Sequence, residues 1–143
     1  MTQIDFYILG NKAKGDKFLL ACRLTEKAYQ SGHRVCITAD SEQDAEHISK
    51  LLWTYNEQSF IPHEICHTKQ NSDAPVLVSN RLELTDEHDV LINLAAEVPA
   101  CFSQFERLLE PVDRDEQNKA SGRNRYKYYR NCGYSINNHE INR

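Results

Sequence analysis

The sequence predicts an α/β protein, a sandwich of three layers around a central, mostly parallel (mixed) sheet. Strand-like and helix-like segments alternate from the N-terminus onward. The apolar run Asp89–Ala95 is nearly continuous, which is typical of a buried parallel strand. The length of 143 residues suits a single domain over residues 1–143 with one core.

The first half of the chain predicts two strands, each followed by a helix. Gln3–Leu9 is rich in β-branched and aromatic residues, as in a strand that ends at Gly10. Lys17–Gln30 repeats apolar residues at helical spacing, Arg34–Ala39 predicts the second strand, and Glu42–Thr54 the second helix. A strand-helix-strand opening favours parallel strands joined by a right-handed crossover.

The second half predicts shorter elements and then a basic helix. The expected segments are a strand at Val76–Ser79, the buried strand Asp89–Ala95, a short helix at Ala100–Gln104, a strand at Phe105–Val112, a helix over about 113–132 capped by Asp113, and a closing strand at Tyr134–Ile136. Gly122 is a poor helix former and predicts a kink or a helix start nearby. Gly133 suits a left-handed cap at the end of this helix.

The basic helix carries an unusual concentration of charge. The stretch from Lys119 to Ile136 holds five cations and no acid, and the remainder of the chain has 12 Lys and Arg against 21 Asp and Glu. A basic island on an acidic protein indicates one localised anionic partner. At 100° per residue, Arg123, Tyr126, Lys127 and Arg130 share one face of the helix, whereas Arg125 and Tyr128 point away. The alternative is a solvated helix face that binds nothing.

Two short patterns suggest enzymes. His63-Glu64-Ile65-Cys66-His67 matches H-E-x-x-H, in which two histidines on one helix face bind zinc and the glutamate activates water. A zinc-dependent hydrolase is therefore an alternative function, but Pro62 and the polar residues after His67 favour a coincidence in a strand or loop.

The segment Gly10–Lys17 resembles a phosphate-binding loop without meeting its requirements. Asp16 would repel a phosphate, and no hydroxyl follows to hold a magnesium ion. We therefore expect neither a nucleotide nor any other cofactor.

Composition argues against membrane insertion and secretion. No apolar run approaches the roughly 18 residues of a membrane span. The N-terminus lacks a signal-peptide pattern, which predicts a cytoplasmic protein. The five cysteines are irregularly spaced and predict reduced, mostly buried thiols rather than disulfides.

Several segments, taken in order, carry a family resemblance. They are F-Y-I-L at Phe6, S-G-H-R-V-C-I at Ser31, L-L-W at Leu51, S-F-I-P-H at Ser59, D-V-L-I-N-L at Asp89 and R-x-R-Y-K-x-Y-R-x-x-G-Y from Arg123 to Tyr134. In these segments the chain resembles the chi-subunit family of bacterial DNA polymerase III over almost its full length, and the last motif is the most specific.

This resemblance implies a non-catalytic adaptor with a Rossmann-like fold that binds no nucleotide. Its partners would be the acidic, phenylalanine-terminated C-terminal tail of the single-stranded DNA-binding protein and the psi subunit, which joins it to the clamp loader. A repair helicase is a further implied partner through the psi-facing surface. Carried over by motif, the tail-binding residues would be Arg123, Tyr126, Lys127, Trp53, Phe60 and Val112.

The residues themselves are compatible with that function. A tail of acidic residues ending in Phe requires an apolar slot for the ring and cations for the carboxylates. Helix geometry adds Arg130 as a contact for the acidic side chains. Direct binding of single-stranded DNA is an alternative, but the net charge of −4 disfavours it and no nucleic-acid or membrane contact is expected.

Overall fold

The computed structural model describes residues 1–56, 61–66, 74–80 and 87–142. In these residues seven strands form one sheet, in the order β3-β4-β2-β5-β6-β1-β7. The elements along the chain are β1 (Gln3–Leu9), α1 (Lys17–Gln30), β2 (Val35–Thr38), α2 (Glu42–Thr54), β3 (His63–Ile65), β4 (Val76–Ser79), β5 (Val90–Asn93), the short 3-10 helix η2 (Phe102–Gln104), β6 (Arg107–Val112), α3 (Glu116–Asn131) and β7 (Ile136–Ile141).

All strand pairs in the described part of the chain are parallel, which confirms the predicted mostly parallel sheet and leaves no antiparallel pair among these residues. The last strand, β7, is also parallel to its neighbour because of the path of the chain before it. α3 carries the chain back to the end of the sheet where β1 begins, and β7 then pairs with β1 in parallel from Ile4 and Ile136 to Leu9 and Ile141.

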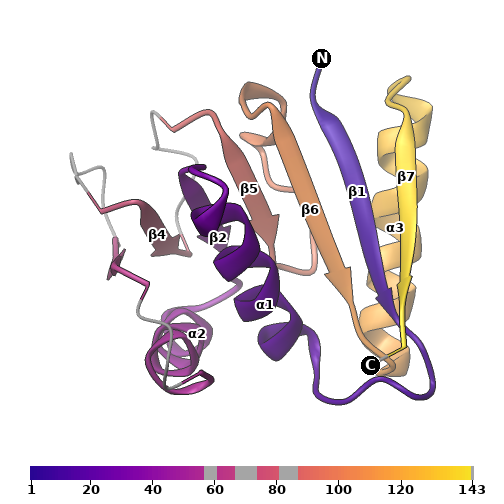
Figure 1. The fold of residues 1–143 in the computed structure, drawn as a ribbon. Helices are drawn as coiled ribbons and strands as arrows, with labels where there is room; N and C mark the ends of the chain where they lie inside the picture. Colours follow the sequence, from indigo (N-terminus) through magenta and orange to yellow (C-terminus); the bar gives the residue numbers. More distant parts are fainter. Residues whose placement is uncertain (57–60, 67–73, 81–86, 143) are drawn as a thin grey trace.

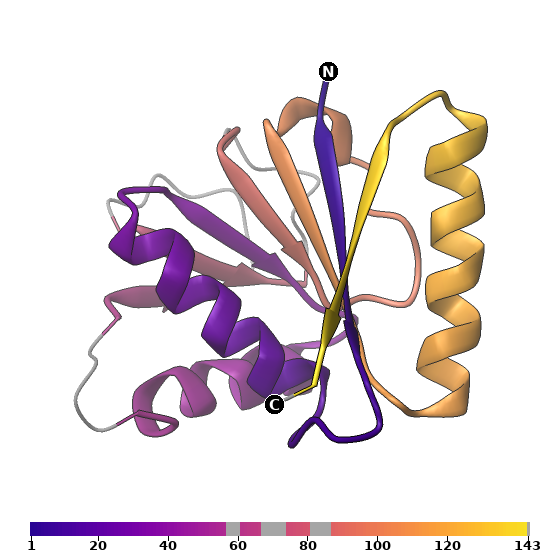
Figure 2. The same cartoon turned by 45° about the vertical axis from the view of Figure 1, so that its right-hand side comes forward.

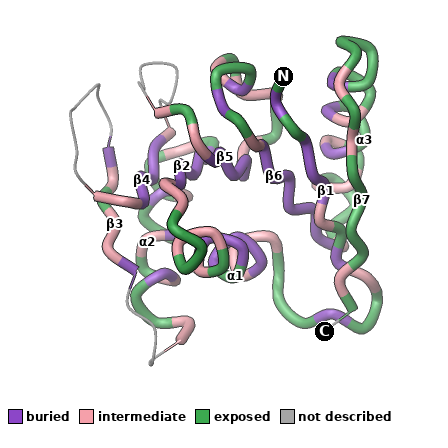
Figure 3. The backbone as a smooth tube through the Cα atoms, turned by 45° about the horizontal axis from the view of Figure 1, so that its top comes forward, coloured by how far each residue is buried: buried purple, intermediate pink, exposed green. Residues whose placement is uncertain are grey.

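Helices cover both faces of this sheet, which confirms the three-layer sandwich. α1 and α2 lie on one face and α3 lies on the other (Figures 1 and 2). Each face has its own apolar core: Leu20 and Ile48 belong to the core under α1 and α2, whereas Leu108, Phe102 and Tyr129 belong to the core under α3. The central strands are buried and β7 is largely exposed at the edge (Figure 3).

The acidic residue of the glycine loop caps the start of α1. The carboxylate of Asp16 accepts a hydrogen bond from the backbone N–H of Leu19 at 3.0 Å and caps the helix. A helix N-terminus attracts anions, and here the protein's own carboxylate already lies there. The Nζ of Lys17 donates to the carbonyl oxygen of Leu94 at 3.0 Å.

The basic helix begins later than predicted. Asp115, not Asp113, is its N-cap and accepts from the backbone N–H of Asn118 at 3.0 Å. Asp113 instead accepts from the backbone N–H of Lys17 at 3.0 Å and so ties the start of α3 to the start of α1. α3 continues without interruption through Gly122 and ends before Gly133, whose φ of 90° is the predicted left-handed cap. The closing strand begins at Ile136 rather than Tyr134.

Burial agrees in part with the expectations for the cysteines. Cys22, Cys36 and Cys66 are buried, whereas Cys132 is exposed. Burial, with a smaller contribution from Asp16, raises the pKa of the Cys22 thiol to about 12, so this group is neutral at pH 7. Within the described residues, no helix has the length and apolar character needed to cross a bilayer.

The edge of the sheet is held by a carboxylate on β1. The side chain of Asp5 is 2% exposed and lies 3.0 Å from both Arg107 Nη2 and His139 Nε2. Burial alone would raise the pKa of Asp5, but the hydrogen bonds from His139 and Arg107 and the charge of Arg107 outweigh it and lower that pKa. The ionised carboxylate therefore joins β1 to both β6 and β7.

We expect Asp5→Asn to destabilise the protein in a pH-dependent way. Because the folded-state pKa of Asp5 is lowered, its contribution is present above the unfolded-state pKa of about 3.9 and is lost as pH falls through the folded value. The variant should lose about 1–2 kcal/mol in the free energy of unfolding near pH 6. Its difference from the wild type should disappear as the pH falls through the folded-state pKa of Asp5. Urea denaturation at several pH values measures this. Glu106→Gln, at an exposed carboxylate, is the control, and a difference that stays constant with pH would contradict the assignment.

Candidate functional site

A cavity opens between the basic helix and the last strands of the sheet. Its volume is about 260 Å³. It is lined by residues from β1, β6, β7 and α3, namely Phe6, Ile8, Val112, Asn138, Lys119, Gly122, Arg123 and Tyr126. We call this cavity the first pocket.

The base of the first pocket is apolar because alternate residues of a strand face the same side. Phe6 and Ile8 of β1 both face α3, and the paired strand β6 adds Val112. Tyr126 packs its ring edge-to-face on Phe6 at 5.2 Å between centroids. Ile8 remains 39% exposed, so a large aliphatic side chain lies open at the mouth.

Gly122 brings α3 close to the sheet at this point. A Cβ on Gly122 would lie 3.1 Å from Cγ2 of Val112, closer than side chains ordinarily pack. The glycine is buried within an unbroken helix. The predicted kink is therefore wrong, and the absence of a side chain instead permits the close approach of α3 to β6 beside the pocket.

Cations surround the apolar base. Arg123 lines the first pocket, and Lys127 and Arg130 are exposed on the same helix. Within the part of the chain that the structure describes, Arg123 and Lys127 have no hydrogen bond or ion pair. Lys119 lies 3.4 Å from Glu116, an exposed pair that contributes little. Arg130 lies over the Tyr126 ring, 6.0 Å from its centroid.

A buried polar network fixes the orientation of α3. Glu110 on β6 is fully buried, and its Oε1 accepts from Arg125 Nε at 2.9 Å. Its Oε2 accepts from the hydroxyl of Tyr129 at 2.6 Å and from Nδ2 of Asn93 at 3.0 Å. Arg125 also donates through Nη1 to the carbonyl oxygen of Ala96 at 2.8 Å. One turn of α3 is thus joined to both β6 and the loop after β5.

The same network alters proton affinities. Burial raises the pKa of Glu110, while the charge of Arg125 and the hydrogen bonds from Tyr129 and Asn93 oppose that rise. Burial and then the Glu110 carboxylate raise the pKa of Tyr129, so its hydroxyl remains a donor. The ion pair with Glu110 neutralises Arg125 within the fold. α3 therefore offers a partner fewer cations than its sequence suggests.

The structure gathers some of the predicted site residues and separates others. Arg123, Tyr126 and Val112 line the first pocket, and Lys127 and Arg130 are exposed nearby on α3. Trp53 lies on α2, which packs on β3 and β4 on the opposite face of the sheet. The structure therefore does not bring Trp53 and Arg123 into one site. Phe60 lies outside the described residues.

The first half of the H-E-x-x-H match lies on a strand. His63 and Glu64 belong to β3, where consecutive side chains point to opposite faces, so the helix that the zinc motif requires is not formed there. The His63 ring contacts the carbonyl oxygen of Ile61 at 2.8 Å and Ser49 Oγ at 2.9 Å. His67 lies outside the described residues. Among the residues that are described, no group of three or more His, Cys, Asp or Glu could hold a metal ion.

Sequence reasoning missed five residues of the first pocket. These are Phe6, Ile8, Lys119, Gly122 and Asn138. The alternation of Phe6 and Ile8 within a predicted strand showed that they share a face. The pairing of β1 with β7 could not be read from the sequence, and without it Asn138 had no predicted neighbour.

Comparisons with known proteins agree on one family. A family model described as the DNA polymerase III chi subunit, HolC, matches residues 1–137. The chain is 29% identical over 143 residues to DNA polymerase III subunit chi of Pseudomonas aeruginosa, with 100% of this chain and 99% of that protein covered. It is 28% identical over 142 residues to the Escherichia coli protein of the same name, with 96% of this chain and 97% of that protein covered.

A solved structure supports the fold alone. The C-terminal domain of the DEAD-box protein Dbp5 superimposes with a TM-score of 0.62 at 12% sequence identity, covering 98% of this chain and 90% of that chain. At that identity the similarity concerns the α/β architecture and carries no argument about activity.

Proposed function

The chain belongs to the DNA polymerase III chi-subunit family, a family of replication accessory subunits, and from that membership we propose a non-catalytic adaptor. It binds the acidic C-terminal tail of the single-stranded DNA-binding protein. Through the psi subunit it links that tail to the clamp loader. The observation that carries the proposal is the first pocket, an apolar cavity at whose rim Arg123 has no partner among the described residues.

The chemistry of the first pocket suits a terminal phenylalanine. The ring packs against Phe6, Ile8 and Val112, and burying it supplies the apolar part of the affinity. The terminal carboxylate lies at the rim, where the guanidinium of Arg123 can bind it with two parallel hydrogen bonds. A chain terminus carries this carboxylate beside the ring, whereas an internal phenylalanine does not.

The acidic residues before the phenylalanine extend the recognition along α3. Lys127 and Arg130 are exposed on that helix and can approach carboxylates beyond the pocket. These contacts are solvent-exposed, so they accelerate association and weaken with salt. The pocket provides specificity and the surrounding cations provide attraction.

An adaptor also requires a second surface for its second partner. Trp53 is 56% exposed on α2, on the far face of the sheet, and its ring lies edge-to-face with His63 at 5.3 Å. Trp is enriched among binding hot spots, so an exposed tryptophan with an aromatic neighbour is a candidate contact for a partner. We therefore assign the psi subunit to the Trp53 surface. Separate faces allow both partners to bind at once.

A titration with a synthetic tail peptide tests the proposal. The peptide carries several acidic residues followed by Pro and a C-terminal Phe with a free carboxylate. We expect binding that weakens as salt increases and a loss of roughly tenfold or more when the C-terminus is amidated, because the Arg123 contact requires the carboxylate. Fluorescence anisotropy measures both effects.

A single-stranded oligonucleotide of matched charge is the control ligand. It should not compete with the peptide, because it lacks a ring next to a terminal carboxylate. Equal binding of the free and the amidated peptide would remove the pocket from the proposal. Displacement by the oligonucleotide would favour the nucleic-acid alternative instead.

A further inference from the structure

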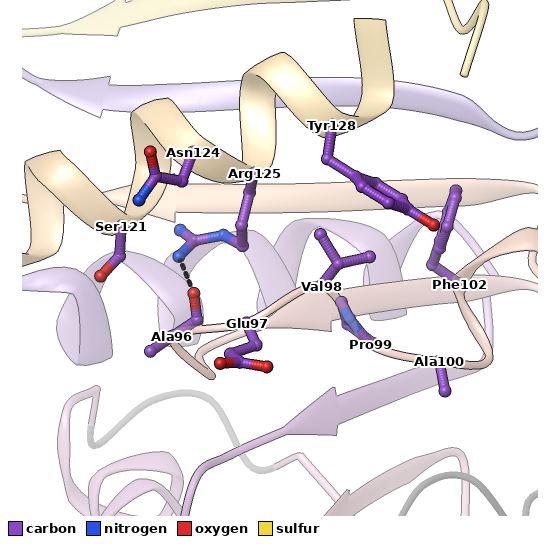
Figure 4. A pocket seen from close by; sticks show the side chains of 10 residues that line it. All are labelled: Ala96, Glu97, Val98, Pro99, Ala100, Phe102, Ser121, Asn124, Arg125 and Tyr128. Carbon is purple, nitrogen blue, oxygen red and sulfur yellow. Dashed lines mark hydrogen bonds between the residues drawn. The ribbon is translucent and has the colours of Figure 1, made fainter. Parts of the chain in front are cut away.

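A second cavity lies on the other flank of α3, and Figure 4 shows it at close range. Its volume is about 530 Å³, within the range of ligand-binding sites. The loop after β5 and η2 form one wall and α3 forms the other. The lining residues are Ala96, Glu97, Val98, Pro99, Ala100, Phe102, Ser121, Asn124, Arg125 and Tyr128. We call this cavity the second pocket.

The charge of the second pocket differs from that of the first. On α3 its wall consists of Ser121, Asn124 and Tyr128, which are neutral, and of Arg125, whose charge is balanced by Glu110. The only lining charge without an ion pair among the described residues is the carboxylate of Glu97. The second pocket therefore does not attract an anion, and its lining favours a ligand without negative charge.

Polar groups without partners converge on this cavity. Arg125 is only 6% exposed, yet its Nη2 has no acceptor among the described residues, while Nε and Nη1 are used by Glu110 and Ala96. The hydroxyl of Ser121 and the amide of Asn124 likewise have no partner in the described part of the chain. Figure 4 shows these three side chains at one end of the cavity. They offer donors and acceptors in the spacing of one helical turn.

The other end of the second pocket is apolar. Tyr128 is 50% exposed and lies edge-to-face with Phe102 at 6.4 Å between centroids, next to Val98 and Pro99 (Figure 4). A row of hydrogen-bonding groups beside an aromatic and aliphatic surface fits an extended peptide. The backbone of such a peptide pairs with the polar side chains, and an apolar or proline side chain packs on Tyr128.

We propose that the second pocket binds an uncharged, extended segment of the same tail, upstream of its acidic tip. The inference rests on the proposed function. α3 is about 10–12 Å across with its side chains, so a path over its outer surface from one pocket to the other is on the order of 17 Å. About five extended residues span that distance. The acidic residues then cross α3 beside Lys127, between the two pockets.

Three peptides test this inference. The first is the terminal segment of about eight residues of the single-stranded DNA-binding protein from the same organism; the second is the terminal segment of about sixteen residues. The third has the length of the second but carries Gly and Ser in place of its upstream half. We expect the native long peptide to bind at least about fivefold more tightly than the other two, which should be equal, because only it fills the second pocket.

Variants of the protein show which residues are responsible for the higher affinity of the native long peptide. Tyr128→Ala should lower the affinity for the native long peptide to that for the short peptide, and it should leave the affinity for the short peptide unchanged. Ser121→Trp, whose larger side chain fills the cavity, should independently have the same effect. Gln117→Ala, an exposed residue on the same helix outside the cavity, should change nothing. Equal affinity of the native and the Gly/Ser peptides, or a gain that survives Ser121→Trp, would overturn the inference while leaving the first pocket intact. Failure of every peptide to bind would overturn the proposed function and this inference together.

Discussion

Arg125→Ala should cost about 3–5 kcal/mol in the free energy of unfolding, although Arg125 lies on the most basic helix of the protein. Its guanidinium is the only cation that contacts Glu110 among the described residues, and Glu110 is fully buried. Removing the arginine leaves a carboxylate without a counter-ion in the apolar core between α3 and β6. Domains of this size are stable by about 5–15 kcal/mol, so the loss is a large fraction of the total.

Urea denaturation of matched variants measures this effect. Lys127→Ala, on the exposed side of the same helix, should remain within about 0.5 kcal/mol of the wild type. The double variant Arg125→Met with Glu110→Leu removes both charges and should recover most of the stability, because hydrophobic residues can replace a buried ion pair. Equal losses for Arg125→Ala and Lys127→Ala would show that the pair does not hold α3 in place.

Arg125 also shows the limits of reading charge from sequence. Helix periodicity separated it from Arg123, Lys127 and Arg130, and the structure agrees that it points elsewhere. The residues next to Arg125 in the sequence gave no sign that it was buried. Its partner Glu110 lies in a different element, a strand whose apolar neighbours predict a core position. Only the packing of α3 on β6 brings the two together.

The elements themselves were largely predictable, whereas their neighbours were not. α1 and α2 agree with their predicted bounds because capping and helical spacing are local signals. The position of β1 between β6 and β7 depends on contacts between distant segments, and so do the first pocket and the parallel direction of β7. Trp53 was grouped with Arg123 for the same reason: a motif gives residue types in order but not the face of the sheet on which each lies.

Arg123→Ala and Trp53→Ala should have opposite consequences for the two proposed partners. Arg123 lies at the rim of the first pocket and Trp53 on the opposite face of the sheet, so each variant is the matched control of the other. Arg123→Ala should lower the affinity for the tail peptide by about 10- to 100-fold, since a charged hydrogen-bond pair to the terminal carboxylate is lost. It should leave psi binding unchanged.

Trp53→Ala should weaken psi binding by about 30-fold or more, as expected for an exposed tryptophan at the centre of an interface. Its affinity for the tail peptide should stay within about twofold of the wild type. Titrations of each variant with the peptide and with purified psi measure all four values. A loss of both partners in either variant, with unfolding curves unchanged, would mean that the two surfaces are coupled or shared. If the surfaces are shared, the adaptor would have to exchange its partners rather than hold them together. If they are coupled, a bound tail would change its affinity for psi by the same factor as bound psi changes its affinity for the tail.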